Sequence, residues 1–391
     1  MFEGNVHSGT CSLIAKYIVV LGCGLGGLKV SSLVSKQLGR SGTVTIVEPR
    51  AKIPLSSSLP WLAFGWREPN RIQKDLKSFA KRKNVRMVAE KVEKINVTGR
   101  TIKTQSHEIA YDKLVISLGA DLAFDEIPGL DTYSHTMYSL EGALKLRDAI
   151  KNFQGGTVVV GVCRTPYKCP AAPYELSLLM EETMRRARKR VDIQLFTPEP
   201  HPVPAAGSVI AKQVERLVTS RGIKYLPKTK LVKVERDTVA FDDGSTLKYD
   251  LFVAIPPHRP PRVVVEAGLT GDSGWVPVNP QNLATRFDDV YAIGDVTSIE
   301  TPHGHAPFLP KAGVFAQGQA GVVANNIAVS LTGKGEMRQW DGMGSCHLQV
   351  SKSESAFLRG SFLSNPPRLE FHPPSRKWYL DKVRRERDWL S

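Results

Sequence analysis

The sequence predicts an α/β protein with two Rossmann-like dinucleotide-binding domains, the first of them discontinuous, and an additional C-terminal region. Three observations predict this fold. Two stretches, beginning near residues 17 and 157, alternate an apolar strand, a helix and a second apolar strand, which is the pattern of parallel βαβ units. A glycine-rich turn follows the first strand of the first stretch. A further apolar strand and a helix signal near residue 290 return the chain to the first domain.

The chain is long enough for this organisation, because 391 residues suffice for two domains with a substantial core. We expect residues 1–128 and 259–330 to form the first domain, residues 129–258 the second domain, and residues 331–391 the C-terminal region. With 41% hydrophobic and 23% charged residues, the composition excludes wholesale disorder.

The formal net charge of +15 favours anionic partners. No nucleic-acid-binding module is recognisable, so we expect no nucleic acid partner and place a membrane surface ahead of one. The sequence leaves the assembly state open, and a homo-oligomer is among the alternatives. No metal site is expected.

The cysteines are few and odd in number, unlike the framework of a secreted disulfide protein; they are Cys11, Cys23, Cys163, Cys169 and Cys346. The first 22 residues lack the pattern of a secretory signal. No apolar run reaches the roughly 18 residues that span a bilayer. We therefore expect an intracellular chain, and no redox role for Cys11 or Cys23.

The first βαβ unit carries a dinucleotide-binding fingerprint after its strand at residues 17–21. Gly22 permits the tight turn, Gly24 lets a pyrophosphate approach the backbone, and Gly27 lets helix and strand pack closely. The helix N-terminus then faces the phosphates. Glu48 ends the second strand, where a carboxylate can bind the ribose hydroxyls. The alternative is a glycine turn that binds nothing.

The strand near residue 290 ends in Gly294 and Asp295, just before a helix signal. An aspartate at this position can hydrogen-bond a ribityl hydroxyl of a flavin, and the following helix directs its positive end toward the cofactor. The alternative is a plain N-cap turn. Another buried strand, within residues 111–121, ends at a glycine.

The second βαβ unit lacks the fingerprint. The loop after its strand at residues 157–162 retains only Gly161, and Pro166, Pro170 and Pro173 remove N–H donors that would bind a phosphate. We therefore expect this domain to keep the Rossmann-like shape without binding NAD(P)H. The other elements expected here are helices over residues 139–153 and 174–190, a strand over residues 191–200, and a hairpin and strand over residues 242–257.

These stretches, in this order, resemble the FAD-dependent pyridine nucleotide–disulfide oxidoreductase superfamily. Within it, the chain is similar to the branch of sulfide:quinone oxidoreductases and flavocytochrome c sulfide dehydrogenases, over roughly residues 15–391. The superfamily motifs are residues 22–27, 118–120 and 292–295, and the branch motif is residues 169–175 with Cys346 downstream. Residues 309–320 match the helix that follows the glycine–aspartate motif.

The resemblance implies FAD as the cofactor. Several relatives bind it through a cysteine thioether in the first domain, but no cysteine lies between Cys23 and Cys163, so we expect non-covalent binding here. Lys311 is implied to lie near the flavin, where it can steady the charge of the reduced cofactor. Gln317 stands where many related chains have a glutamate, so no proton role is expected there. The implied FAD-binding residues are Gly22, Gly24, Gly27, Glu48, Gly119, Gly294, Asp295 and Lys311.

The resemblance also implies a redox disulfide between Cys169 and Cys346 beside the flavin. Sulfide, or a related small thiol or persulfide, attacks it, and the electrons pass through FAD to a quinone. Glu175 is implied to accept a proton, with a helix first-turn carboxylate as the alternative. Cys163 is either a third sulfur carrier or resolving thiol, or a structural cysteine. His201 is a candidate for proton transfer, with an exposed loop histidine as the alternative.

The tail, residues 375–391, reads as a basic helix with tryptophans near both ends. It suits a membrane interface, a dimer contact or a cap over the flavin domain. We expect a cytoplasmic protein, peripheral on the inner face of the membrane. The rival functions are an NAD(P)H-dependent disulfide or persulfide reductase, an NADH:quinone dehydrogenase, and a flavin-binding redox sensor without turnover.

Overall fold

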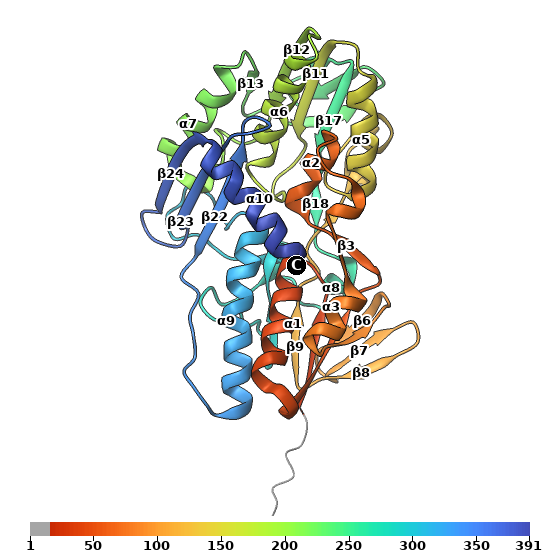
Figure 1. Cartoon of the computed structure of the whole chain (residues 1–391), viewed down its shortest axis with the longest axis vertical. Coiled ribbons are helices and arrows are strands. Elements are labelled where there is room, and N and C mark those ends of the chain that lie inside the picture. Colours follow the sequence, from red (N-terminus) through yellow and green to blue (C-terminus); the bar gives the residue numbers. More distant parts are fainter. Residues whose placement is uncertain (1–15) are drawn as a thin grey trace, which may run out of the picture.

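The computed structural model describes residues 16–391, and Cys11 lies outside the described residues. Two lobes are stacked along the long axis of the molecule, and the C-terminal sheet and helix lie beside their junction (Figure 1). Parallel sheets in both lobes confirm the predicted α/β class.

The lower lobe contains a five-stranded parallel sheet in the order β20-β9-β1-β2-β5. Side chains alternate along its central strand, so that Ile18 and Val20 join one core cluster and Val19 and Leu21 join another. Both faces are therefore buried. The strands are β1 (Lys16–Leu21), β2 (Gly42–Val47), β5 (Arg86–Val88), β9 (Lys113–Ile116) and β20 (Val290–Ala292), and the helices α1 (Leu25–Leu38) and α9 (Gly313–Thr332) pack against each other.

The upper lobe contains a four-stranded parallel sheet in the order β13-β12-β11-β17. The helix predicted over residues 174–190 begins earlier, at Ala172, with Pro173 in its first turn, where a missing N–H costs little. The strands are β11 (Gly156–Val162), β12 (Val191–Phe196), β13 (Lys224–Leu226) and β17 (Leu251–Ile255), and the helices are α5 (Leu140–Asn152), α6 (Ala172–Arg186) and α7 (Gly207–Thr219).

The chain crosses between the lobes at two paired strands, β10 (Asp121–Leu122) and β18 (His258–Arg259). Small sheets and short helices complete the lobes. They are β3 (Lys52–Pro54), β4 (Gln73–Asp75), β6 (Val92–Asn96), β7 (Thr101–Thr104), β8 (Glu108–Ala110), β14 (Leu231–Val234), β15 (Thr238–Phe241), β16 (Thr246–Lys248), β19 (Val276–Pro277), β21 (Thr297–Ser298), α2 (Leu59–Ala63), α3 (Leu76–Lys83), α4 (Leu130–Tyr133) and α8 (Arg262–Glu266).

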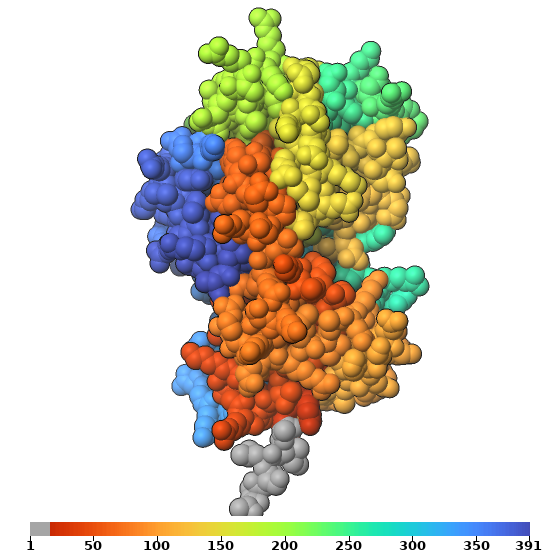
Figure 2. All heavy atoms as spheres, turned by 45° about the vertical axis from the view of Figure 1, so that its right-hand side comes forward, coloured from red at the N-terminus to blue at the C-terminus, as the bar shows by residue number. Residues whose placement is uncertain are grey.

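The C-terminal region is an antiparallel sheet followed by one helix: β22 (Met343–Gln349), β23 (Ser355–Ser361), β24 (Arg368–Ser375) and α10 (Arg376–Leu390). Figure 2 shows this region, in blue, against the orange segment near α2. The Glu386 carboxylate fixes this contact, since it accepts hydrogen bonds from Ser58 Oγ at 2.7 Å and from Arg67 Nη2 at 2.8 Å. The tail of the chain is therefore joined to an early segment of the sequence.

The aromatic residues of α10 face the protein. The Trp378 ring stacks on Phe357 with a centroid separation of 4.3 Å, and Trp389 lies under the Lys74 ammonium at 5.3 Å. The exposed face of α10 instead carries mainly charged side chains, including Arg384 and Arg387. Within residues 16–391, no helix combines the length and the apolar character needed to cross a bilayer.

Candidate redox site

The glycine turn after β1 is tightly packed at two of the three fingerprint glycines. Gly22 has a φ of 87°, and a Cβ atom there would lie 2.5 Å from the Ser117 carbonyl oxygen. At Gly27, a Cβ atom would lie 1.9 Å from the Gly22 carbonyl oxygen, whereas at Gly24 it would meet nothing within 4 Å. The protein thus leaves open space at Gly24, above the N-terminus of α1, where a pyrophosphate fits.

This difference gives a prediction for two matched substitutions. Gly27→Ala forces the backbone apart, and we expect it to lower the free energy of unfolding by about 1–3 kcal/mol and to abolish dinucleotide binding. Gly24→Ala should leave the unfolding of the cofactor-free protein unchanged but weaken cofactor binding tenfold or more, about 1.4 kcal/mol. Denaturant unfolding and flavin titration measure the two effects. If Gly24→Ala and Gly27→Ala lowered the free energy of unfolding equally, Gly24 would not be the open position of the turn.

Glu48 follows β2 and is 3% exposed. Its Oε2 accepts the Cys23 backbone N–H at 3.1 Å, and Arg50 Nε donates to Oε1 at 2.6 Å. Burial opposes ionisation, but the hydrogen bonds and charge of Arg50 outweigh it, so the pKa of Glu48 is lowered. The carboxylate is therefore charged and fixed beside the glycine turn. The pairing of Glu48 with Arg50, two residues downstream, was not predicted from the sequence.

The equivalent position of the second βαβ unit has no carboxylate. Glu48 N–H donates to the last residue of the neighbouring strand, Val88, and Thr197 N–H does the same to Leu226 in the upper lobe. Thr197, fully buried, therefore occupies the place of Glu48. A Cβ atom at Gly161 would lie 2.1 Å from the Phe196 ring, so an aromatic side chain covers the end of β11.

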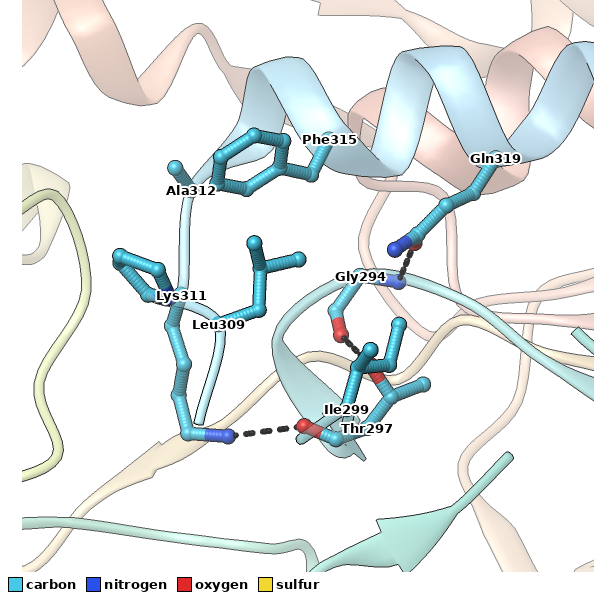
Figure 3. Close-up of a pocket in the computed structure, with 9 residues that line it drawn as sticks. Gly294, Thr297, Ile299, Leu309, Lys311, Ala312, Phe315 and Gln319 are labelled. Carbon is cyan, nitrogen blue, oxygen red and sulfur yellow. Dashed lines mark hydrogen bonds between the residues drawn. The ribbon is translucent and has the colours of Figure 1, made fainter. Parts of the chain in front are cut away.

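An aspartate with a buried, unpartnered side-chain oxygen follows Gly294, whose bond to Gln319 is drawn in Figure 3. Gly294, with a φ of 77°, donates its N–H to Gln319 Oε1 at 2.7 Å. Asp295 Oδ1 is buried without a hydrogen-bond partner, and burial raises the pKa of Asp295. An unpartnered buried acceptor calls for a donor, and a ribityl hydroxyl of a flavin supplies one. Gln319, one helical turn into α9, was not found from the sequence.

Lys311 lies beside this aspartate. Its Nζ donates to the backbone carbonyls of Asp295 at 2.8 Å and Thr297 at 3.2 Å, and it lies 3.3 Å from the centroid of the Trp275 ring. Burial lowers the pKa of Lys311 to about 7.

Gly119, which follows β9, has a φ of 71°, a backbone conformation that favours glycine.

Two cysteines far apart in the sequence meet at this site. Cys169 has a φ of 57°, and its N–H donates to the Lys311 carbonyl at 2.7 Å, which ties it to the Asp295 turn. Cys346 lies in the middle of β22, opposite Leu358. The two thiols interact, which raises the pKa of Cys169 and lowers that of Cys346. Both thiols are free here, and Cys346 is the more acidic.

The surroundings of Cys346 are apolar. Cys346 helps to line an apolar cavity, together with Ala171, Val203, Ile210, Val214, Leu348, Phe357, Leu358 and Phe371. The cavity lies between α7 and the C-terminal sheet, and its other lining side chains are apolar. Such a lining favours uncharged or polarisable atoms over ions.

A buried ion pair lies close to the two thiols. Glu175, in the first turn of α6, is 5% exposed, and its Oε1 lies 2.6 Å from Nζ of Lys382 on α10. Gln349 N–H donates to Glu175 Oε2 at 3.1 Å, and the Gln349 side-chain oxygen accepts from Lys382 Nζ and Trp61 Nε1. The Lys382 charge lowers the pKa of Cys346, while the Glu175 charge raises it.

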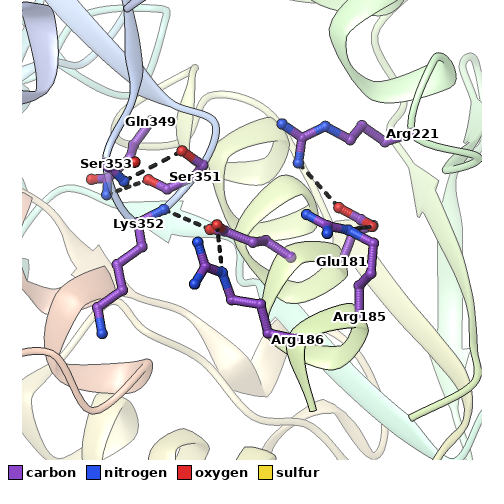
Figure 4. A network of polar contacts seen from close by, with 9 residues as sticks. Glu181, Arg185, Arg186, Arg221, Gln349, Ser351, Lys352 and Ser353 are labelled. Atoms are coloured by element: carbon purple, nitrogen blue, oxygen red, sulfur yellow. Dashed lines mark hydrogen bonds and ion pairs between the residues drawn. The ribbon is translucent and has the colours of Figure 1, made fainter. Parts of the chain in front are cut away.

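The turn after β22 holds the C-terminal sheet against α6 (Figure 4). The Lys352 backbone N–H donates to Glu182 Oε2 at 2.6 Å, and Arg186 Nε donates to Glu182 Oε1 at 2.9 Å. Cys169 precedes α6 and Cys346 lies in β22. The hydrogen bonds to Glu182 therefore help to hold the two sulfurs close together.

The remaining candidates lie apart from the pair. Cys163 is 2% exposed and packs in a separate core cluster with Phe196 and Phe252, and burial raises its pKa. His201 is partly exposed, with its Nδ1 at 3.3 Å from the Pro202 carbonyl. The structure therefore brings together Cys169, Cys346, Glu175 and Lys311 but not Cys163.

Comparison with known proteins agrees with this geometry. A profile of the family described as pyridine nucleotide-disulphide oxidoreductase matches residues 16–320. The chain is 23% identical to a mouse mitochondrial sulfide:quinone oxidoreductase, over 94% of this chain and 83% of the relative. It is 28% identical to an Aquifex aeolicus sulfide-quinone reductase, over 80% of this chain and 76% of the relative. The X-ray structure of the sulfide:quinone oxidoreductase from Aquifex aeolicus superposes with a TM-score of 0.87 at 23% identity, covering 96% and 91% of the two chains.

Proposed function

Because the chain belongs to the pyridine nucleotide-disulphide oxidoreductase family, we propose that it is an FAD-dependent oxidoreductase that oxidises sulfide and reduces a quinone. The observation that carries this proposal is the pair of interacting thiols, Cys169 and Cys346, with Cys169 tied through Lys311 to the Asp295 turn. The names and coverage of the relatives support the substrate pair.

The residues of the lower lobe fit FAD. Gly22, Gly24 and Gly27 would hold the pyrophosphate, Glu48 the ribose and Asp295 the ribityl chain. Bound FAD supplies a two-electron acceptor that oxidises the sulfur pair and passes the electrons to the quinone. We propose non-covalent binding, and Lys311 and Gly119 as further contacts. Denaturation should then release the flavin.

The sulfur chemistry needs the pair in its disulfide form. Hydrosulfide attacks the Cys346 sulfur, the S–S bond breaks, and the products are a Cys346 persulfide and a Cys169 thiolate. A second hydrosulfide attacks the outer sulfur of the persulfide and releases HSSH and a Cys346 thiolate. Two hydrosulfides thereby lose two electrons, which leave when the disulfide re-forms. We place the persulfide on Cys346 because this residue lines the apolar cavity.

The charged groups around the pair have supporting roles. We propose that Glu175 accepts a proton during the reaction, acting as a unit with Lys382, which holds its carboxylate at 2.6 Å. Cys163 is proposed as a structural cysteine, because it is buried in a different cluster. His201 is not assigned a role in proton transfer.

The acceptor and location follow from the same proposal. A quinone dissolved in a bilayer requires the protein to touch the membrane surface. Since the aromatic residues of α10 face inward, we propose that its cationic face binds anionic headgroups, on the cytoplasmic side. A matching homo-oligomer interface is not assigned.

The proposal is tested with the purified holoprotein under anaerobic conditions. We expect sulfide to bleach the flavin absorbance and a short-chain quinone to restore it. NADH should bleach nothing, because Phe196 covers Gly161 and Thr197 replaces the ribose-binding carboxylate. Bleaching by NADH would instead indicate an NAD(P)H-dependent reductase. A bound flavin that neither reductant bleaches would indicate a redox sensor.

A further inference from the structure

A carboxylate without an ion-pair partner lies behind the Cys169 loop. Glu199 follows β12, and its Oε2 accepts hydrogen bonds from Tyr167 Oη at 2.8 Å and Thr197 Oγ1 at 3.2 Å. Glu199 forms no salt bridge with any Lys, Arg or His among residues 16–391. Its hydrogen-bond donor Tyr167 is 4% exposed. The mechanism proposed above does not use either residue.

Tyr167 connects this carboxylate to the redox loop. It lies two residues before Cys169, and its Oη is also 3.5 Å from the Pro170 carbonyl, one residue after Cys169. Other contacts of the loop include the Tyr138 Oη hydrogen bond to the Lys168 carbonyl at 2.7 Å, the Lys168 Nζ bond to the Ala120 carbonyl at 3.4 Å and the Cys169 N–H bond to Lys311. Because Cys169 is held with a positive φ, its position depends on such external contacts.

The titratable groups around Glu199 are three tyrosines. Tyr167 faces it from the loop, Tyr174 from α6 and Tyr225 from β13, and the pKa values of all three are raised mainly by burial. Burial also raises the pKa of Glu199 to about 7. Its charge therefore changes near neutral pH, and a charged acceptor binds a hydroxyl donor more strongly than a neutral acceptor does.

We propose that Glu199 is a positioning residue that holds the Cys169 loop through Tyr167, more tightly in its ionised form than in its protonated form. The loop is then more firmly held above neutral pH than below it. The inference rests on the proposed function only in taking Cys169 as a reacting sulfur.

The test is hydrogen–deuterium exchange of the holoprotein from pH 6 to pH 8, corrected for the intrinsic pH dependence of exchange. In the unsubstituted protein, we expect exchange of the peptide covering residues 163–172 to slow at least threefold across neutral pH. In Glu199→Gln, this step should vanish, with exchange staying at the fast, low-pH level. Glu215→Gln is the matched control, since Glu215 lies near Tyr225 without bonding to Tyr167, and it should keep the step.

A second variant separates loop positioning from stability. Glu199 has a raised pKa in the folded state, so it contributes stability that is lost as pH rises from about 4.5 to about 7. Tyr167→Phe should abolish the exchange step while thermal unfolding keeps this pH dependence, whereas Glu199→Gln should abolish both. Persistence of the exchange step in either variant overturns the proposal. Because exchange is measured without sulfide, this result is independent of whether sulfide is the substrate.

Discussion

Replacing Cys346 or Cys169 with serine should slow the reduction of the flavin by sulfide about 1000-fold or more, equivalent to about 4 kcal/mol of barrier. The reason is that a hydroxyl cannot form the S–S bond that hydrosulfide attacks. Stopped-flow absorbance under anaerobic conditions measures the rate. Because the substitutions do not touch the glycine turn or Asp295, the variants should still bind flavin.

The control for the two serine variants is Cys163→Ala. Cys163 is buried in the core cluster of the upper lobe, so its removal should cost some stability but leave the rate of sulfide-dependent bleaching within about threefold of the parent, less than about 1 kcal/mol. A loss in Cys163→Ala as large as in Cys346→Ser would return Cys163 to the catalytic set. Full activity of Cys169→Ser and Cys346→Ser would remove the disulfide from the mechanism altogether.

Chemical labelling provides a second test of the interaction between Cys169 and Cys346. The hydrogen bond from Cys169 lowers the pKa of Cys346, so the reduced protein should be alkylated first at Cys346 wherever the reagent reaches both sulfurs. In Cys169→Ala no donor remains beside Cys346, and alkylation of Cys346 should shift to higher pH. Peptide mass spectrometry distinguishes the two sites.

The local parts of the site could be predicted from the sequence. Gly22, Gly24, Gly27 and Glu48 lie in one continuous βαβ unit, so their geometry follows from short-range chain rules. The same holds for Asp295, three residues after the end of β20. In each case, the strand that ends at the residue fixes its position at the sheet edge.

The meeting of Cys169 and Cys346 did not follow from any local pattern. Their pairing was implied by a resemblance, because no spacing rule relates a loop of the upper lobe to a strand of the C-terminal sheet. It depends on tertiary contacts such as the bond from Lys352 to Glu182. The Tyr167–Glu199 contact likewise joins two loops that become neighbours only because β11 and β12 are parallel and adjacent.

The C-terminal helix shows how a local pattern can mislead. Its residues read as a basic helix with tryptophans near both ends, suited to a membrane interface, a dimer contact or a cap, but do not predict that Lys382 and Glu386, one turn apart, are both 7% exposed. Lys382 points to Glu175, and Glu386 to Arg67 and Ser58. Alternating charges along a helix give no sign of which face will be buried, since the partners come from α6 and from the residues on either side of α2.

Removing the Lys382 charge should destabilise the protein strongly. Lys382→Met leaves the buried Glu175 carboxylate without its cation, and breaking one partner of a buried pair costs about 3–5 kcal/mol. Denaturant unfolding of the holoprotein measures this cost. Glu175→Gln together with Lys382→Met removes both charges and should recover most of the loss. Because Lys382 lowers the pKa of Cys346, Lys382→Met should also shift alkylation of Cys346 to higher pH.

The matched control for Lys382→Met is an exposed pair of the same kind. Lys145 and Glu141 lie 2.7 Å apart on α5 with side chains 69% and 78% exposed, so Lys145→Met should change the unfolding free energy by less than about 1 kcal/mol. If Lys382→Met costs no more than Lys145→Met, the ion pair does not join α10 to α6. If the double variant is as unstable as Lys382→Met alone, the loss comes from packing around Trp61 rather than from the stranded carboxylate.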